Sequence, residues 1–187
     1  MRYSQKSHNT NSKVMYAIIG FMLFPVIVSL FRSPTGQPVN FNAIPDTTLI
    51  DGYSFFKSEG ILFDEHSFLT LYNTVYRYIG TPHRSRAGTQ GLDCLGLVKK
   101  VFEEAHGISL HGSSRDLYNT TLRVDEPDLA EGDLVFFTIG SNQINHVGIY
   151  LNNDRFVHTS FTDGVTINAL SESYYARYYY GAGRVNR

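Results

Sequence analysis

The chain has 187 residues, 42% of them hydrophobic, and its 16 basic and 17 acidic residues give a net charge of −1. This length fits one domain with an appendage, and the apolar fraction suits a globular core. The near-zero charge excludes the strong positive field of a nucleic-acid-binding protein. A single cysteine, Cys94, excludes an internal disulfide and a cysteine-type metal cluster.

The first 31 residues predict where in the cell the protein is located. Residues 14–31 contain no charged side chain, and residues 1–13 carry three basic residues and no acidic one. A basic head before an apolar run is the layout of an export signal, and about 18 residues just span a bilayer. We expect either an uncleaved membrane anchor, with the domain facing the periplasm or cell exterior, or a cleaved signal that leaves a secreted protein. A buried soluble helix is a third alternative, although the run lacks a polar face.

Residues 32–60 are predicted to link this segment to the folded domain. Residues 33–38, with the sequence SPTGQP, are rich in turn-forming residues, and Asp51-Gly52 continues the pattern. We therefore predict a linker over residues 32–60 and one domain over residues 61–187.

Helices are predicted to precede strands within the domain. A helix is expected over residues 66–78, a second from Asp93 to a stop at Gly107, and a short third one over residues 113–118. The pattern then changes to about five strands, over residues 133–138, 145–151, 155–160, 165–170 and 181–185. Helices followed by adjacent strands with short turns favour an α+β fold with an antiparallel sheet.

Cys94 is the first candidate for chemistry. Asp93 is a good helix N-cap, so the cysteine falls in the first turn of the second helix. The free N–H groups and the dipole at that end favour a thiolate, the nucleophilic form of cysteine. The alternative is a small apolar residue that packs the helix.

Two histidines, His146 and His158, are predicted to lie on one face of a hairpin. If residues 152–154 form a three-residue loop, His158 lies opposite Gly148, and the two histidines become diagonal neighbours within side-chain reach. A two-residue loop would put them on opposite faces. One imidazole can then act as base while the other orients it. The alternatives are satisfied histidines on a sheet face, or a zinc site formed with Cys94. The remaining histidines are expected to be surface or loop residues (8, 66, 83, 106 and 111).

Several of these motifs, in this order, resemble the NlpC-type cell-wall peptidases, a circularly rearranged papain-like family. Residues 93–98 (DCLGLV) are similar to its Asp-Cys-Ser-Gly-hydrophobic-Val box, and residues 132–134 to its Gly-Asp-Leu strand. Residues 146–150 and 156–158 resemble its two later histidine strands. The resemblance implies a papain-like core with N-terminal helices packed on an antiparallel sheet.

The resemblance also implies an activity. Cys94 would be the nucleophile, His146 the general base and acid, and His158 its orienter. The reaction would be hydrolysis of an amide bond in a peptidoglycan stem peptide, the bond between D-glutamate and the diamino acid, during bacterial cell-wall remodelling. No cofactor and no metal are expected, and the protein is expected to act as a monomer.

The family pattern assigns two supporting roles. A tyrosine, carried here to Tyr76 with Tyr78 as the alternative, would aim its hydroxyl near the developing oxyanion. Asp93 would help to bind the amino group of the stem. Leu95 replaces the family's serine, which puts the substrate in doubt, and two other functions stay open. One is a cysteine-dependent amidase or acyltransferase acting on another amide or ester, and the other is a non-catalytic binding module with the same fold.

Overall fold

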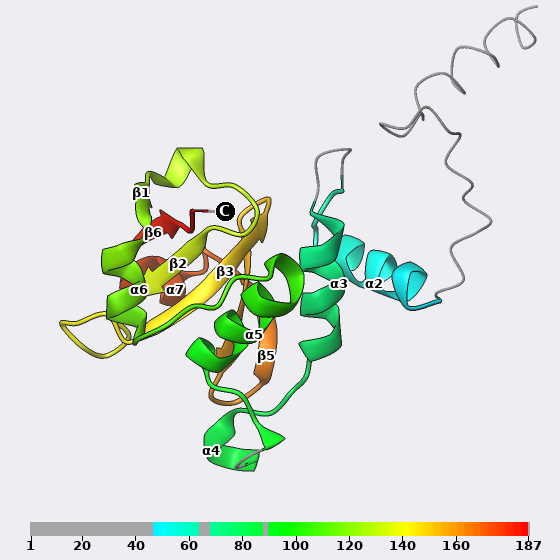
Figure 1. Ribbon diagram of the computed structural model, residues 1–187, viewed down its shortest axis with the longest axis horizontal. Coiled ribbons are helices and arrows are strands. Elements are labelled where there is room, and N and C mark those ends of the chain that lie inside the picture. The colour runs from blue at the N-terminus through cyan, green and yellow to red at the C-terminus, as the bar shows by residue number, and fades with distance from the viewer. Residues whose placement is uncertain (1–46, 64–67, 88–89, 187) are drawn as a thin grey trace, which may run out of the picture. The chain divides into compact units, whose positions relative to one another are not determined.

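The computed structural model describes residues 47–63, 68–87 and 90–186, and the chain from Thr47 onward forms one compact unit (Figure 1). The predicted anchor or signal, residues 1–31, lies outside the described residues. Within the described ranges, no helix has the length and apolar character needed to cross a membrane.

The unit is an α+β domain with one six-stranded antiparallel sheet. The helices are α2 (Thr47–Ser58), α3 (Leu69–Tyr78), α4 (Arg84–Ala87), α5 (Cys94–His106), α6 (Ser114–Thr120) and α7 (Ser173–Tyr178). The strands are β1 (Leu122–Val124), β2 (Leu134–Phe137), β3 (His146–Asn152), β4 (Arg155–Ser160), β5 (Gly164–Ala169) and β6 (Tyr179–Arg184), and a 3-10 turn covers Glu126–Asp128. The sheet order is β1-β6-β2-β3-β4-β5, and every neighbouring pair is antiparallel.

Helix α5 is the element that carries the cysteine onto the sheet. Asp93 caps it, because its carboxylate accepts a hydrogen bond from the Gly96 N–H at 2.6 Å. Gly107 ends it in the left-handed conformation, with a φ of 68°. The apolar face between these caps packs against β3 and β4, and α3 packs against α5 in turn (Figure 1).

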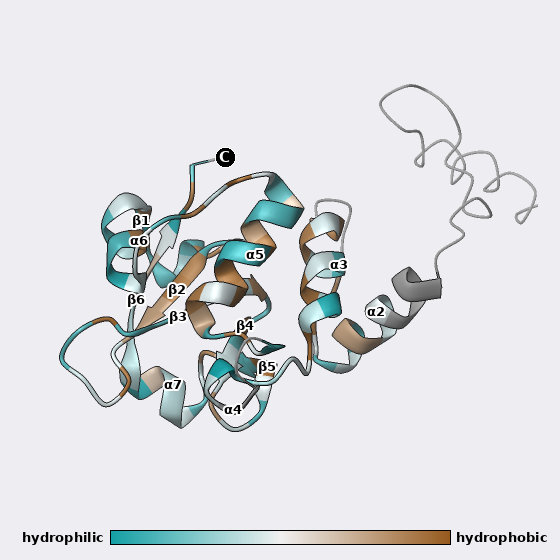
Figure 2. Cartoon of the chain, turned by 60° about the horizontal axis from the view of Figure 1, so that its bottom comes forward, coloured by the Kyte–Doolittle hydropathy of each residue, from teal (hydrophilic) through white to brown (hydrophobic). Residues whose placement is uncertain are grey.

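The sheet is covered on both faces. Leu134 and Phe136 of β2 join the larger core on the side of α3 and α5, while Val135 and Phe137 join a smaller aromatic cluster with residues of α7. All four β2 side chains are buried. This explains why β2 is a continuous apolar run, brown along its length in Figure 2, instead of an alternating one.

The Gly-Asp-Leu sequence at residues 132–134 has a structural role at the start of β2. The Asp133 carboxylate is fully buried and accepts hydrogen bonds from Nε and Nη2 of Arg184, each at 2.7 Å. It also accepts the Ala130 N–H at 2.8 Å. This bidentate ion pair connects β6 to the turn that precedes β2.

Two features differ from the expectation. The sheet has six strands because β1, a short edge strand, pairs with β6. Helix α2 lies within the predicted linker, and the compact unit begins at Thr47. Phe56 of α2 is 1% exposed in the main core, so this helix belongs to the domain. Turn-forming residues marked the segment as a linker, but burial of its aromatic residues decides its structure.

Candidate active site

The thiol of Cys94 lies at the start of α5, against the first residues of β3. It interacts with the backbone N–H of Val147, the residue after His146, and with the N–H groups of Leu95 and Cys94 itself. The β3–β4 pairing begins only at Ile149–Val157, so Val147 lies beyond its last pair.

The β3–β4 hairpin has the expected register, but its turn differs from the predicted one. Asn153 and Asp154 form a two-residue turn, both with positive φ (50° and 66°), as in a type I′ turn. The three-residue loop predicted over residues 152–154 is therefore wrong. A register shift between Tyr150 and Asn152 adds the missing residue as a bulge, and Ile149 still faces Val157.

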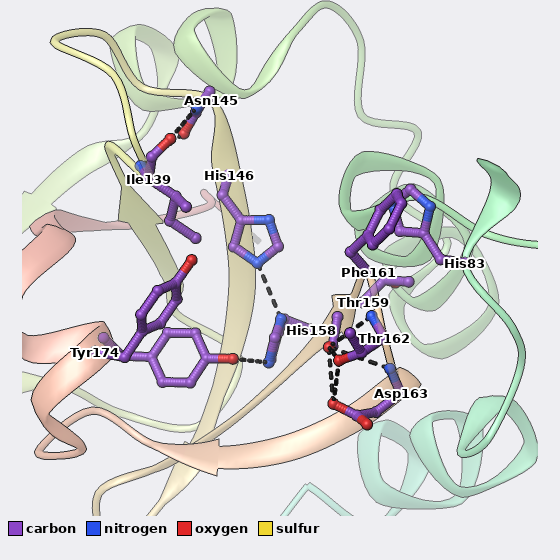
Figure 3. A pocket seen from close by; sticks show the side chains of 12 residues that line it. His83, Ile139, Asn145, His146, His158, Thr159, Phe161, Thr162, Asp163 and Tyr174 are labelled. Carbon is purple, nitrogen blue, oxygen red and sulfur yellow. Dashed lines mark hydrogen bonds between the residues drawn. The ribbon is translucent and has the colours of Figure 1, made fainter. Parts of the chain in front are cut away.

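The bulge places the two histidines on one side of the hairpin and in contact. His146 Nε2 lies 3.0 Å from His158 Nδ1, and this hydrogen bond is drawn in Figure 3. The two rings meet edge to face, with their centroids 5.0 Å apart. His158 is 1% exposed and stacks on Phe156. Because the two facing nitrogens share a hydrogen bond, they do not face a common metal ion. In the described part of the chain, no three His, Cys, Asp or Glu side chains are placed to hold one.

Burial sets the ionisation of all three groups. It lowers the pKa of His146 to about 3, with further lowering from His158 and His83. Burial also lowers the pKa of His158, against the opposing effect of its hydrogen bond to Asn168. For Cys94, burial raises the pKa above its ordinary value of 9.0, although the Val147 N–H opposes this. The N–H groups at the helix end lower the thiol pKa, the direction expected, but desolvation acts in the opposite direction and is the larger effect.

His158 has partners beyond His146. Its Nε2 lies 3.0 Å from Asn168 Oδ1 and 3.0 Å from the Tyr175 hydroxyl. Asn168 is on β5, two residues beyond Thr166, the partner of His158 across β4 and β5. Strand parity therefore puts Asn168 on the same face, and this alternation is a signal that the sequence pattern itself carries.

A pocket of about 450 Å³ opens beside the two histidines (Figure 3). Its walls include His83 and Phe161, whose ring centroids are 5.3 Å apart. His83 was expected to be an ordinary loop residue. A β-bridge pairs His83 with Leu92, the residue immediately before the Asp93 cap. The only sequence signal for His83 is its position in the loop that precedes Cys94.

The two tyrosines considered for the oxyanion role both contact neighbouring helices. The Tyr76 ring packs against Phe55 and Phe56 of α2, with centroids 5.6 and 6.3 Å away. The hydroxyl of the alternative, Tyr78, donates to Glu104 on α5. Neither tyrosine lines the histidine pocket. Cys94 does not line that pocket either, so the oxyanion role of Tyr76 stays a prediction.

Asp93 and Leu95 both have local structural roles. One carboxylate oxygen of Asp93 caps α5, and the other lies 3.6 Å from an Arg84 guanidinium nitrogen. A substrate amine at Asp93 would compete with Arg84. Leu95 is half-buried against the main core, and it does not line the histidine pocket.

The chain is similar in sequence to a family of known proteins. A model of the NlpC/P60 family matches residues 73–184. The Escherichia coli (strain K12) protein named murein DD-endopeptidase MepS/murein LD-carboxypeptidase is 38% identical over 107 residues, which cover 57% of this chain and 56% of that relative. The gamma-DL-glutamyl hydrolase of Bacillus subtilis (strain 168) is 37% identical over 102 residues, covering 53% of this chain and 25% of that one.

A solved structure shares the fold. It is described as similar to lipoprotein, NLP/P60 family, from Staphylococcus aureus subsp. aureus Mu50. The TM-score is 0.57 at 31% identity, and the match covers 68% of this chain and 44% of that one. This chain spans less than two thirds of the length of each of these three proteins.

Proposed function

The chain belongs to the NlpC/P60 family, and from this membership we propose that it is a cysteine peptidase that hydrolyses an amide bond in peptidoglycan stem peptides. The observation that carries the proposal is the thiol of Cys94 at the backbone N–H of Val147, the residue that follows His146, together with the hydrogen bond between His146 and His158. A helix-terminal thiol beside an oriented imidazole is the arrangement that acyl transfer through sulfur requires.

The resting pair is neutral, because the pKa of Cys94 is raised and that of His146 is lowered. The described residues contain no hydrogen bond between the thiol and the His146 ring, and catalytic hydrogen bonds of this kind are often formed only in the complex with substrate. The S–H proton then passes to Nδ1 of His146 as sulfur attacks the amide carbon. Backbone N–H groups at the start of α5 face the developing oxyanion.

Two further proton transfers complete the reaction. His146 gives its proton to the leaving nitrogen as the C–N bond breaks, which leaves an acyl group on sulfur. Water then attacks the thioester, and His146 takes a proton from it. That proton returns to sulfur as the acid leaves, so the free thiol and the neutral imidazole are restored. His158 holds the orientation of His146 throughout.

The bond that we propose is the one between D-glutamate and the diamino acid. The name of the Bacillus subtilis relative, a gamma-DL-glutamyl hydrolase, supports a glutamyl bond. The name of the Escherichia coli relative points to a DD bond instead. Peptidoglycan lies outside the cytoplasmic membrane, so we also propose that residues 14–31 export the domain and either anchor it there or are cleaved.

The test is digestion of purified stem peptides by the full-length chain and by Cys94→Ala, followed by mass analysis. We expect the wild type to release fragments that separate D-glutamate from the diamino acid, and the variant to release none. Cleavage between the diamino acid and D-alanine would reassign the bond and keep the chemistry. Equal cleavage by both proteins, or none by the wild type on several stem types, would contradict the proposal.

The two alternative functions gain no specific support. A different amide or ester substrate was motivated by an apolar groove at Leu95, but that side chain packs against the core. A binding module has no need of a buried imidazole pair beside a thiol.

A further inference from the structure

The hydrogen-bond chain that begins at His146 does not end at His158. It continues through Asn168 on β5 to Glu172, the residue before α7. We propose that Glu172, acting through Asn168, fixes the tautomer of both histidines, so that His146 presents an unprotonated Nδ1 to the Cys94 thiol. Asn168 and Glu172 are then positioning residues, and only the catalytic consequence rests on the proposed function.

The first step is the orientation of the Asn168 amide. Its Nδ2 lies 3.2 and 2.9 Å from the two carboxylate oxygens of Glu172. An ionised carboxylate accepts hydrogen bonds and donates none, so the Asn168 amide nitrogen must face Glu172. The amide oxygen therefore faces His158. Glu172 is itself held in place, because its carboxylate accepts the Ala169 N–H at 2.8 Å.

In the second step, the orientation of the Asn168 amide determines which nitrogen of each imidazole carries the proton. The Asn168 oxygen accepts only, so the proton of a neutral His158 lies on Nε2, 3.0 Å away. The lone pair on His158 Nδ1 then faces His146 and accepts from its Nε2–H at 3.0 Å. His146 is left with its lone pair on Nδ1. Among the described residues, that nitrogen has no hydrogen-bond partner, which suits a base that waits for a proton.

Tyr175 supplies the competing arrangement that makes Glu172 necessary. Its hydroxyl lies 3.0 Å from His158 Nε2, and burial raises its pKa to about 12, so it keeps its proton at neutral pH. If that proton were donated to Nε2, His158 would carry its own proton on Nδ1, and His146 would carry one on its own Nδ1. That state cannot accept a proton from Cys94. With Asn168 fixed, the hydroxyl donates to Asn168 Oδ1 at 3.4 Å instead.

The test uses Glu172→Gln, which keeps the size of the side chain and an oxygen for the Ala169 N–H. Its amide nitrogen then faces Asn168, so the Asn168 amide turns over and donates to His158. We expect kcat to fall by about tenfold or more, with KM unchanged, because the wrong tautomer has no base for the thiol. The double variant Asn168→Asp/Glu172→Gln restores an acceptor toward His158 and a donor toward residue 168. It should recover most of kcat.

The protonation of the His146 and His158 ring nitrogens distinguishes this proposal from a purely structural role of Glu172, because a structural role would not change it. Long-range ¹H–¹⁵N spectra of the ¹⁵N-histidine-labelled full-length chain distinguish protonated from unprotonated nitrogens, and loss of signals in His146→Gln and His158→Gln assigns them. We expect Nε2–H on both rings in the wild type and in the double variant. Glu172→Gln should show Nδ1–H on both rings. Glu103→Gln, an exposed glutamate on α5, is the matched control and should leave spectrum and kcat unchanged.

Three results would overturn the proposal. They are a wild type with Nδ1–H on His146, a Glu172→Gln variant with unchanged ring nitrogens, and a double variant that is as slow as Glu172→Gln. The spectra require no substrate. A protein that shows the expected tautomers and their change, yet cleaves no stem peptide, would refute the proposed function and leave the assignment of the tautomer in place.

Discussion

At the scale of single residues, Gly148 determines whether the two histidines meet. A Cβ atom at this position would lie 2.7 Å from the Phe156 ring, 2.8 Å from the Val157 carbonyl oxygen and 3.3 Å from His158 Cβ. The backbone carbonyl cannot move aside as a flexible side chain would. The missing side chain is therefore what lets β4 bring His158 close to β3.

We expect Gly148→Ala to lower the free energy of unfolding by about 1–3 kcal/mol, as overpacking of a tight site does. It should also lower kcat/KM, because His158 must shift. Chemical denaturation and peptide kinetics measure the two effects. The control is Gly52→Ala in α2, where the new Cβ would make an ordinary 3.5 Å contact with Tyr76. Helix propensity makes that change neutral or stabilising. Equal behaviour of the two variants would contradict the role of Gly148.

The ionisation of Cys94 is also decided at this scale. Sequence places the thiol correctly at a helix N-terminus, where the dipole lowers a thiol pKa. The depth of burial, which depends on residues distant in sequence, acts in the opposite direction and is the larger effect. A local motif therefore identified the group, but not its charge.

At the scale of elements, α2 shows how composition can mislead. Its segment has the glycine and polar residues of a linker, yet Phe56 packs edge to face on Tyr72 of α3, with centroids 5.0 Å apart. Phe63 packs on Tyr72 as well, at 4.6 Å. Helix α2 is thus the outer layer of the helical side of the domain.

We expect Phe56→Ala to destabilise the domain by about 3–5 kcal/mol, the usual cost of deleting a buried aromatic ring. Chemical denaturation of the full-length chain measures it. Ser54→Ala, at an exposed position of the same helix, should change the free energy of unfolding by less than about 0.5 kcal/mol. If Phe56→Ala lowered the free energy of unfolding as little as the control does, α2 would not contribute to the stability of the domain.

At the scale of the whole molecule, the buried imidazoles couple stability to pH. The pKa of His146 falls from 6.5 to about 3 on folding, and that of His158 also falls. Below pH 6.5 the unfolded chain binds protons that the folded protein excludes, so stability is lost as pH decreases from 6.5 toward 3. Each such group contributes at most about 1.4 kcal/mol per pH unit.

We therefore expect the free energy of unfolding to decrease between pH 7 and pH 5, and to decrease less steeply in His146→Gln. Denaturant titrations at the two pH values measure the slopes, and the difference between variant and wild type removes the contribution of the carboxylates. His111→Gln, at an exposed position, should retain the wild-type slope. The same slope in His146→Gln would show that this imidazole does not change its ionisation on folding.

The sequence by itself determined the elements whose causes are local. The Asp93 cap, the period of α5, the stop at Gly107 and the run of strands depend on neighbouring residues, and the order of motifs around Cys94, His146 and His158 indicated the family. The sixth strand, the bulge after Tyr150, the place of Tyr76 and the chain from His158 to Glu172 depended on the tertiary structure. Each of them is set by packing or hydrogen bonding between segments far apart in the chain, and no local pattern specifies such contacts.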